Sequence, residues 1–356
     1  MTTVDLLRAP ERSQEDRPVL IDLVLAVRKS RLQHLLKNVK LARTGTKPQI
    51  RSRIEEAVEQ GHLRHETLVE FLDSVSLWGK QHVLLFDGPR HPIDEWKDPE
   101  QVHQTLKQFQ LDRLFNDHLP LVLPETLTLS SIAHTGERLR VTAVRRDEYD
   151  ERAPQHDAHE VTKNGERINL RAYKRHVSRV LVSFEWDLVA NTAMLQITQL
   201  HRELEYEEAA QGFWALLRGW LDIERFTPLD VRPVIRRLQD LEASGTPEVR
   251  SHGIHYRTLR GRRLSAQSPG PRDSVLGETG IDEAMRSVAR EGVGHLGNFY
   301  WLAQDGDGAA SMNAAMPPLR RDIRVLIVAS KGRIHFTTPN DEEAVRHVLS
   351  RVRSLR

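Results

Sequence analysis

The chain has 356 residues, a formal net charge of +2 at neutral pH and a mean hydropathy of -0.51. It contains no cysteine, which excludes disulfide bonds, thiolate catalysis and cysteine-ligated zinc. No stretch reaches the roughly 20 apolar residues of a membrane helix and the N-terminus lacks a signal-peptide pattern, so we expect no membrane partner and a cytoplasmic location.

The first quarter of the chain has the periodicity of helices. Residues 1–17 are polar and charged, which predicts a disordered tail. Residues 18–89 carry apolar residues at helical spacing and then a short apolar run, which predicts a basic helical domain. The polar stretch 90–99 predicts a linker.

From residue 100 to 356, helical spacing alternates with runs of period two. This alternation is typical of an antiparallel sheet covered by helices. The predicted fold class is therefore α+β, with an all-helical N-terminal module followed by an antiparallel-sheet domain covered by helices. The pattern leaves open two strand–strand–helix halves, about 100–245 and 246–356.

The segment from Leu23 to Ile54 combines basic residues with apolar residues at helical spacing. It contains no Asp or Glu, although acidic and basic residues nearly balance over the whole chain. Clustered charge on a folded segment is typical of a polyanion-binding surface. We therefore expect contacts with DNA phosphates from its basic side chains: Arg28, Lys29, Arg31, Lys37, Lys40, Arg43, Lys47, Arg51 and Arg53.

The tripeptide Gly45-Thr46-Lys47 predicts the start of a helix. Gly45 permits a tight backbone turn, and Thr46 is a suitable N-cap. The free amides of a helix start can hold a phosphate together with Lys47, so Gly45 and Thr46 also belong to the predicted DNA site.

Residues 28–58 resemble a SAP-type DNA-binding module, a small helix–loop–helix unit. The resemblance implies contact with duplex DNA chiefly through its backbone and shape. Pro48 and the loop Ala42-Arg43-Thr44 depart from the family pattern. The residues that carry the resemblance are Leu32, Leu35, Leu36, Leu41, Gly45, Thr46, Lys47, Ile50, Arg53 and Ile54.

The order of the predicted elements faintly resembles the centromere-protein-N family of kinetochore proteins. The shared features are a basic helical N-terminus, the segment Trp78-Gly-Lys-Gln-His82 and a strand-rich C-terminal half that ends in a hairpin and a helix. This resemblance implies a non-enzymatic adaptor that binds DNA or chromatin.

Two further basic clusters are secondary nucleic-acid candidates. An aromatic ring among cations can stack on a base, and the alternative for both clusters is a solvated rim. The first consists of Arg171, Tyr173, Lys174 and Arg175, and the second of Arg260, Arg262 and Arg263.

No recognisable catalytic motif is present, so we expect a non-enzymatic protein without metal or cofactor. The pairs His156/His159 and His252/His255 lack the third and fourth ligands of a zinc site. Glu95-Trp96-Lys97 matches half of a nuclease core, but it lies in the predicted linker.

The sequence favours a DNA-binding protein that contacts duplex DNA phosphates, with the C-terminal α+β domain binding a protein partner or clamping the DNA. The first alternative is a protein-interaction adaptor that docks an acidic partner. The second is a nuclease with a cryptic site.

Overall fold

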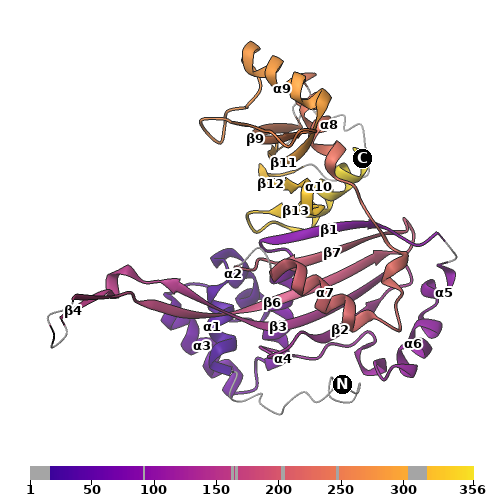
Figure 1. Cartoon of the computed structure of the whole chain (residues 1–356). Helices are drawn as coiled ribbons and strands as arrows, with labels where there is room; N and C mark the ends of the chain where they lie inside the picture. Colours follow the sequence, from indigo (N-terminus) through magenta and orange to yellow (C-terminus); the bar gives the residue numbers. More distant parts are fainter. Residues whose placement is uncertain are drawn as a thin grey trace.

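The computed structural model describes residues 17–90, 93–161, 164, 167–201, 205–245, 248–303 and 319–356. The predicted disordered tail falls almost wholly outside these residues. The described chain opens with helices and continues into a large antiparallel sheet, which confirms the predicted α+β class (Figure 1). The opening helices are α1 (Arg17–Ala26), α2 (Lys29–Asn38), α3 (Lys47–Glu59) and α4 (His65–Leu77).

The sheet has eleven strands, and every pair of neighbours in it is antiparallel. Its order is β10-β9-β11-β12-β13-β1-β7-β6-β3-β2, and the short strand β8 adds to β1. The bounds are β1 (Gln81–Asp87), β2 (Thr128–His134), β3 (Arg138–Arg152), β6 (Tyr173–Asp187), β7 (Thr192–Thr198), β8 (Thr227–Pro228), β9 (Val249–Thr258), β10 (Arg263–Gln267), β11 (Gly292–Trp301), β12 (Ile323–Val328) and β13 (Arg333–Phe336).

Two meanders of four strands flank β1. The first, β2–β3–β6–β7, follows α6 (Pro99–Gln108) and precedes α7 (Glu205–Leu217). The second, β9–β11–β12–β13, follows α8 (Arg232–Ala243) and precedes α10 (Glu342–Ser354). The boundary expected near residue 245 falls between α8 and β9.

Strand β1 joins the two meanders, because it pairs with β7 on one side and with β13 on the other. The sequence places β1 in the N-terminal domain 18–89, whereas its partners belong to the region after the predicted linker. That linker contains the short helix α5 (Asp94–Lys97). A chain cut in the linker would therefore leave β1 hydrogen-bonded within the sheet.

Three hydrophobic cores hold the layers together. The first lies among α1–α4 and is centred on side chains such as Leu36 and Ile54. The second lies between the first meander and α6 and α7, and includes Phe184 and Phe213. The third lies between the second meander and the helices α8, α9 (Thr279–Glu291) and α10. None of the described helices has the length and apolar composition to span a bilayer.

The helical module is attached to the sheet by the side chain of Arg179 in β6. This side chain is 3% exposed and forms an ion pair with Asp73 of α4. Its guanidinium also donates to the carbonyl oxygens of Val122 and Leu121, both at 3.0 Å. The second oxygen of Asp73 lies 2.6 Å from Nε2 of His118. The cluster therefore connects α4, β6 and the segment that precedes β2.

A second buried charge attaches α10 to the sheet. Glu185 of β6 accepts hydrogen bonds from Arg140 of β3 and from both terminal nitrogens of Arg346 in α10. Burial raises the pKa of Glu185, but the hydrogen bonds and charges of Arg346 and Arg140 lower it further, so the net shift is downward. The carboxylate therefore stays ionised at neutral pH.

His82 makes the stability of the central strand depend on pH. Its ring lies 3.8 Å from that of Tyr206 and 4.0 Å from that of His335. Burial, with the nearby charges of His335 and Arg333, lowers its pKa to about 2. Because the unfolded chain binds a proton below about pH 6.5 and the folded chain does not, this residue makes the folded state less stable as the pH falls below 6.5.

We expect the free energy of unfolding to fall by about 2 kcal/mol more between pH 7 and pH 5 in the wild type than in His82→Gln. Glutamine cannot titrate, so the variant lacks this contribution, although its stability at pH 7 will be lower. Urea denaturation at both pH values measures the difference. Equal pH dependence in the two proteins would show that His82 is not held neutral.

Candidate nucleic-acid interface

The loop between α2 and α3 begins with an unusual backbone conformation at Lys40. The N–H of Val39 donates to the carbonyl of Leu35 at 3.0 Å, and that of Leu41 donates to Leu36 at 2.7 Å. Lys40 between them has a φ of 58°, in the left-handed region where glycine is the usual residue at the end of a helix. The chain therefore accepts backbone strain at an exposed lysine.

The start of α3 has the features that the sequence predicts. Thr46 is its N-cap residue, and the N–H of Thr46 donates to Oε1 of Gln49 at 2.9 Å, which is half of a capping box. Gly45 has a φ of 128°, and a Cβ there would lie 2.9 Å from Arg53 and from Gln49. Glycine is thus favoured by the backbone conformation, and a Cβ would also displace the ends of the side chains that brace the loop.

Arg53 braces this loop from α3. Its Nη1 donates to the carbonyl oxygen of Ala42 at 2.8 Å and to that of Thr44 at 2.6 Å. The side chain therefore fixes the shape of the loop, whereas the sequence assigns Arg53 to DNA phosphates.

Two other arginines of the predicted site also have intramolecular partners. Arg31 forms an ion pair with Asp341, the N-cap residue of α10. Arg51 pairs with Asp22 of α1 and, at 3.4 Å, with Glu55. These contacts hold α2 against the C-terminal helix and α3 against α1, so neither guanidinium is free for a phosphate without loss of a contact.

Six cations of the predicted site remain available. All are exposed, and none has a hydrogen bond or an ion pair from its side chain within the described part of the chain. Four of them flank the junction of α2 and α3 and are called here the basic loop: Lys37, Lys40, Arg43 and Lys47. The other two, Arg28 and Lys29, lie at the start of α2.

The first secondary cluster lies on an arm that projects from the body (Figure 1). The arm consists of the outer halves of β3 and β6 with the hairpin of β4 (Ala158–Val161) and β5 (Arg167–Leu170). Arg175 faces Asp150 and Glu148 of β3, and Lys174 is paired in register with Glu151. Acidic residues thus accompany the cations along the arm.

The remaining residues of that cluster lie near the base of the hairpin. Tyr173 is 58% exposed, and the guanidinium of Arg152 lies 5.5 Å from its ring centroid. Arg171 is close enough to Asp157 to lower the pKa of that carboxyl group, after the larger effects of Arg152 and the amide of Ala172. The arm therefore lacks a continuous basic track.

The second secondary cluster lies at the tip of the β9–β10 hairpin. Arg260, Arg262 and Arg263 are exposed there. Leu259, beside them, is 88% exposed. This tip presents cations and an apolar side chain to solvent together.

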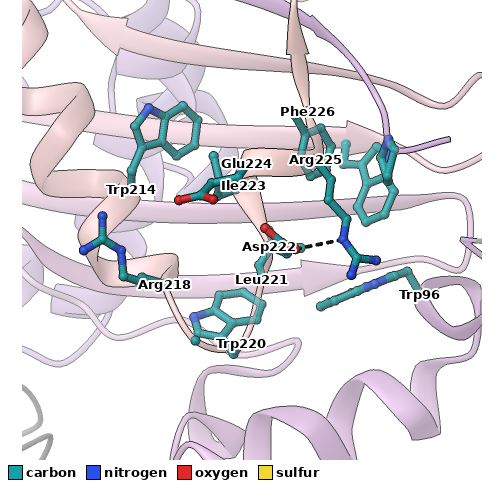
Figure 2. Close-up of a pocket in the computed structure, with 13 residues that line it drawn as sticks. Trp96, Trp214, Arg218, Trp220, Leu221, Asp222, Ile223, Glu224, Arg225 and Phe226 are labelled. Carbon is teal, nitrogen blue, oxygen red and sulfur yellow. Dashed lines mark ion pairs between the residues drawn. The ribbon is translucent and has the colours of Figure 1, made fainter. Parts of the chain in front are cut away.

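A pocket of about 640 Å³ rich in tryptophan, which was not predicted from the sequence, lies beside the segment that follows α7. Four of the six tryptophans of the chain line it: Trp96, Trp186, Trp214 and Trp220. Figure 2 shows Trp214 and Trp220 on one side of the segment that follows α7 and Trp96 on the other. These residues come from α5, β6 and α7 and its following turn, so only the folded chain brings them together.

The charges at the mouth of this pocket cancel. Nε of Arg225 lies 2.8 Å from Oδ2 of Asp222, and Figure 2 marks this ion pair. The lining has one further basic residue, Arg218, and one further acidic residue, Glu224. An aromatic pocket with no net charge fits a flat apolar group, but it does not select one class of ligand.

The residues considered for metal or nuclease chemistry do not converge. His252 bonds to Ser268 at 2.5 Å, and His255 bonds to Ser265 at 2.7 Å. Lys97 pairs with Asp94 of the same short helix at 3.0 Å. Within the described ranges, no three histidine, aspartate or glutamate side chains are grouped as a metal ion would need.

The basic loop is thus a group of four exposed cations without partners among the described residues, on a loop that Arg53 holds in place. It lies within the region that resembles a SAP-type module, and that resemblance stays a prediction. No protein-family model matches the chain, and no curated protein sequence is similar to it.

Proposed function

We propose that this protein binds duplex DNA through the phosphate backbone, with the basic loop as its main contact. The observation that carries the proposal is the group of exposed cations on α2, α3 and their loop whose side chains have no partner among the described residues. Not one acidic residue lies between Leu23 and Ile54 to neutralise them. Such an unbalanced basic surface attracts a polyanion and gains affinity by release of counterions.

The scaffold supports this role because the loop is held from several directions. Arg53 fixes the loop carbonyls, and Gly45 and Thr46 set the start of α3. In the first turn of α3, Pro48 has no N–H and the amide of Ile50 donates to the carbonyl of Thr46 at 3.0 Å. The amide of Lys47 can therefore bind a phosphate beside the ammonium group of the same residue, in a turn that carries no acidic residue. Contacts of this kind position a protein on DNA without reading its sequence.

The alternative is an adaptor whose basic loop docks an acidic protein segment. The two functions differ in what they require of the partner, because counterion release from a duplex gives a steep and uniform dependence on salt. Binding of an acidic protein segment would instead depend on the shape of that segment. The protein would then have no affinity for duplex DNA of arbitrary sequence.

Lys40→Gly separates the function of this lysine from its effect on stability. Glycine relieves the left-handed strain, so we expect the variant to be more stable by about 1 kcal/mol. It also loses one phosphate contact, which should weaken duplex binding about eightfold in 0.1 M salt. Chemical denaturation and fluorescence anisotropy with a labelled duplex measure the two effects.

Lys40→Ala is the matched control, because it removes the same charge and keeps the strain. We expect it to lose as much affinity as Lys40→Gly without the gain in stability. If both variants bound duplex DNA as tightly as the wild type, Lys40 would have no part in binding and the adaptor alternative would gain support.

A further inference from the structure

Among the described residues, helices α8, α9 and α10 cover one face of the second meander. On the other face α7 reaches β13, where the guanidinium of Arg333 lies 5.0 Å from the ring centroid of Tyr206. The side chains of Val325, Ile327 and Ile334 point into the core formed with α8, α9 and α10. The residues that alternate with them point to the opposite face, which we call the open face. Its apolar members Leu296, Leu326 and Val328 are half-buried and belong to none of the cores of the described residues.

Strand register places the side chains of the open face in rows across the strands. His335 of β13 pairs with Leu326 of β12, and Arg324 pairs with Tyr300 of β11. Farther along, Leu296 pairs with His255 of β9. Apolar, aromatic and basic side chains thus share this side of the strands, although His335 is stacked on His82 beside Tyr206 of α7.

The open face is strongly biased toward positive charge. Strands β9, β10, β11, β12 and β13 contain no aspartate or glutamate at all. Arg257 pairs with Arg263 across the β9–β10 hairpin, and both are exposed. His295 lies beside them, and its pKa is lowered by burial and then by Arg263, Arg257 and His255. Neither Arg257 nor Arg263 has an acidic partner among the described residues, whereas Arg250, at the other end of the face, pairs with Asp322 at 3.2 Å. An anionic partner would supply the missing counter-charge to Arg257 and Arg263.

Tyr300 gives this basic surface an aromatic centre. The guanidinium of Arg250 lies 5.3 Å from its ring centroid, and the ring of His252 lies 5.6 Å from it edge-on. Arg324 occupies the paired position on β12. A planar ring with arginines beside it on a sheet is a surface on which a nucleobase can stack.

We propose that the open face binds single-stranded nucleic acid. Arg257, Arg263 and Arg324 would neutralise phosphates, and the bases would lie on Tyr300 and the neighbouring leucines. A single strand fits this surface better than a duplex, because aromatic and apolar side chains on a sheet need bases whose faces are unstacked. The arginines at the tip of the β9–β10 hairpin extend the track beyond the sheet.

This site is separate from the basic loop. Leu77 and Trp78, at the end of α4, pack in the same core as α10, on the covered face of the sheet. The helical module therefore adjoins the face opposite to the open one. The two proposals stand on different residues and can fail independently.

The test uses the full chain, a labelled oligonucleotide of about 20 thymidines and a duplex of equal length. We expect Arg257→Ala/Arg263→Ala to weaken single-strand binding about 20-fold in 0.1 M salt and to flatten its salt slope by about 1.4. Duplex binding should stay unchanged. The matched control is Arg286→Ala/Arg290→Ala, which removes two exposed arginines from α9 on the covered face.

Tyr300→Leu tests stacking, because it removes the ring and keeps an apolar side chain. We expect it to lose about tenfold in single-strand affinity, and circular dichroism checks that the sheet is intact. Wild-type protein that fails to bind the single strand would overturn the proposal. So would equal affinities for the arginine variant and its control, or loss of duplex and single-strand binding alike. Loss of duplex binding from changes in the basic loop would not bear on it.

Discussion

We expect Arg179→Ala to lower the free energy of unfolding by about 3–5 kcal/mol. Arg179 is 3% exposed on its side chain and pairs with Asp73, which is itself 16% exposed. Alanine would leave the Asp73 carboxylate buried without its cation, and the carbonyl oxygens of Val122 and Leu121 without their donor. An uncompensated buried charge costs more than the ion pair itself contributes.

Arg175→Ala is the control from the same strand, since Arg175 is 69% exposed and its pairs with Glu148 and Asp150 lie at the surface. We expect a change within about 0.5 kcal/mol for this variant. Urea denaturation followed by circular dichroism compares the two. A loss of less than about 1 kcal/mol for Arg179→Ala would show that the cluster does not hold the helical module to the sheet.

Local periodicity was sufficient to predict the class of the fold. The spacing of Leu32, Leu35 and Leu36 gives α2, and Gly45 with Thr46 marks the start of α3, as the structure has them. The short apolar run at the end of residues 18–89 forms β1. Its neighbours in the sheet were not predictable, because Val83 pairs with Gln196 on one side and with Ile334 on the other.

The excess of basic residues in the N-terminal module was likewise visible in the sequence. The intramolecular partners of its individual arginines were not. The partner of Arg31 is Asp341, at the far end of the chain, and Arg53 bonds to backbone carbonyls that no residue pattern specifies. The lysines at the same junction have no such partners among the described residues. The structure therefore distinguishes them from the paired arginines, whereas in the sequence all nine basic residues of the predicted site looked alike.

The other surfaces needed the tertiary structure for a similar reason. The tryptophans of the pocket come from separate elements, although their number in the chain was a signal. The open face becomes apparent only when the register shows which side of each strand is covered. The clues to it within the sequence were the basic cluster of Arg260, Arg262 and Arg263 and the lack of acidic residues in the segments that form β9–β13.

We expect replacement of the four basic-loop residues Lys37, Lys40, Arg43 and Lys47 by alanine to weaken duplex DNA binding about 10³-fold in 0.1 M salt. Each lost phosphate contact removes the favourable release of its counterions, and four such losses multiply. All four side chains are exposed and none has a partner among the described residues, so the fold should be little affected.

A control with the same change of net charge distinguishes the loop from a general effect of charge. The control replaces four exposed residues outside the basic loop: Lys107 on α6, Arg218 in the turn after α7, and Arg286 and Arg290 on α9. We expect their joint replacement by alanine to reduce duplex affinity by much less than tenfold, because only long-range and screened attraction is lost.

The most direct measurement of the central claim is the slope of log affinity against log salt for the wild type and the basic-loop variant, on two duplexes of unrelated sequence. The proposed phosphate contacts predict that the variant flattens the slope by about 3.6 units, and equally on both duplexes. An unchanged slope, or wild-type protein that binds neither duplex, would contradict the assignment of this loop to DNA.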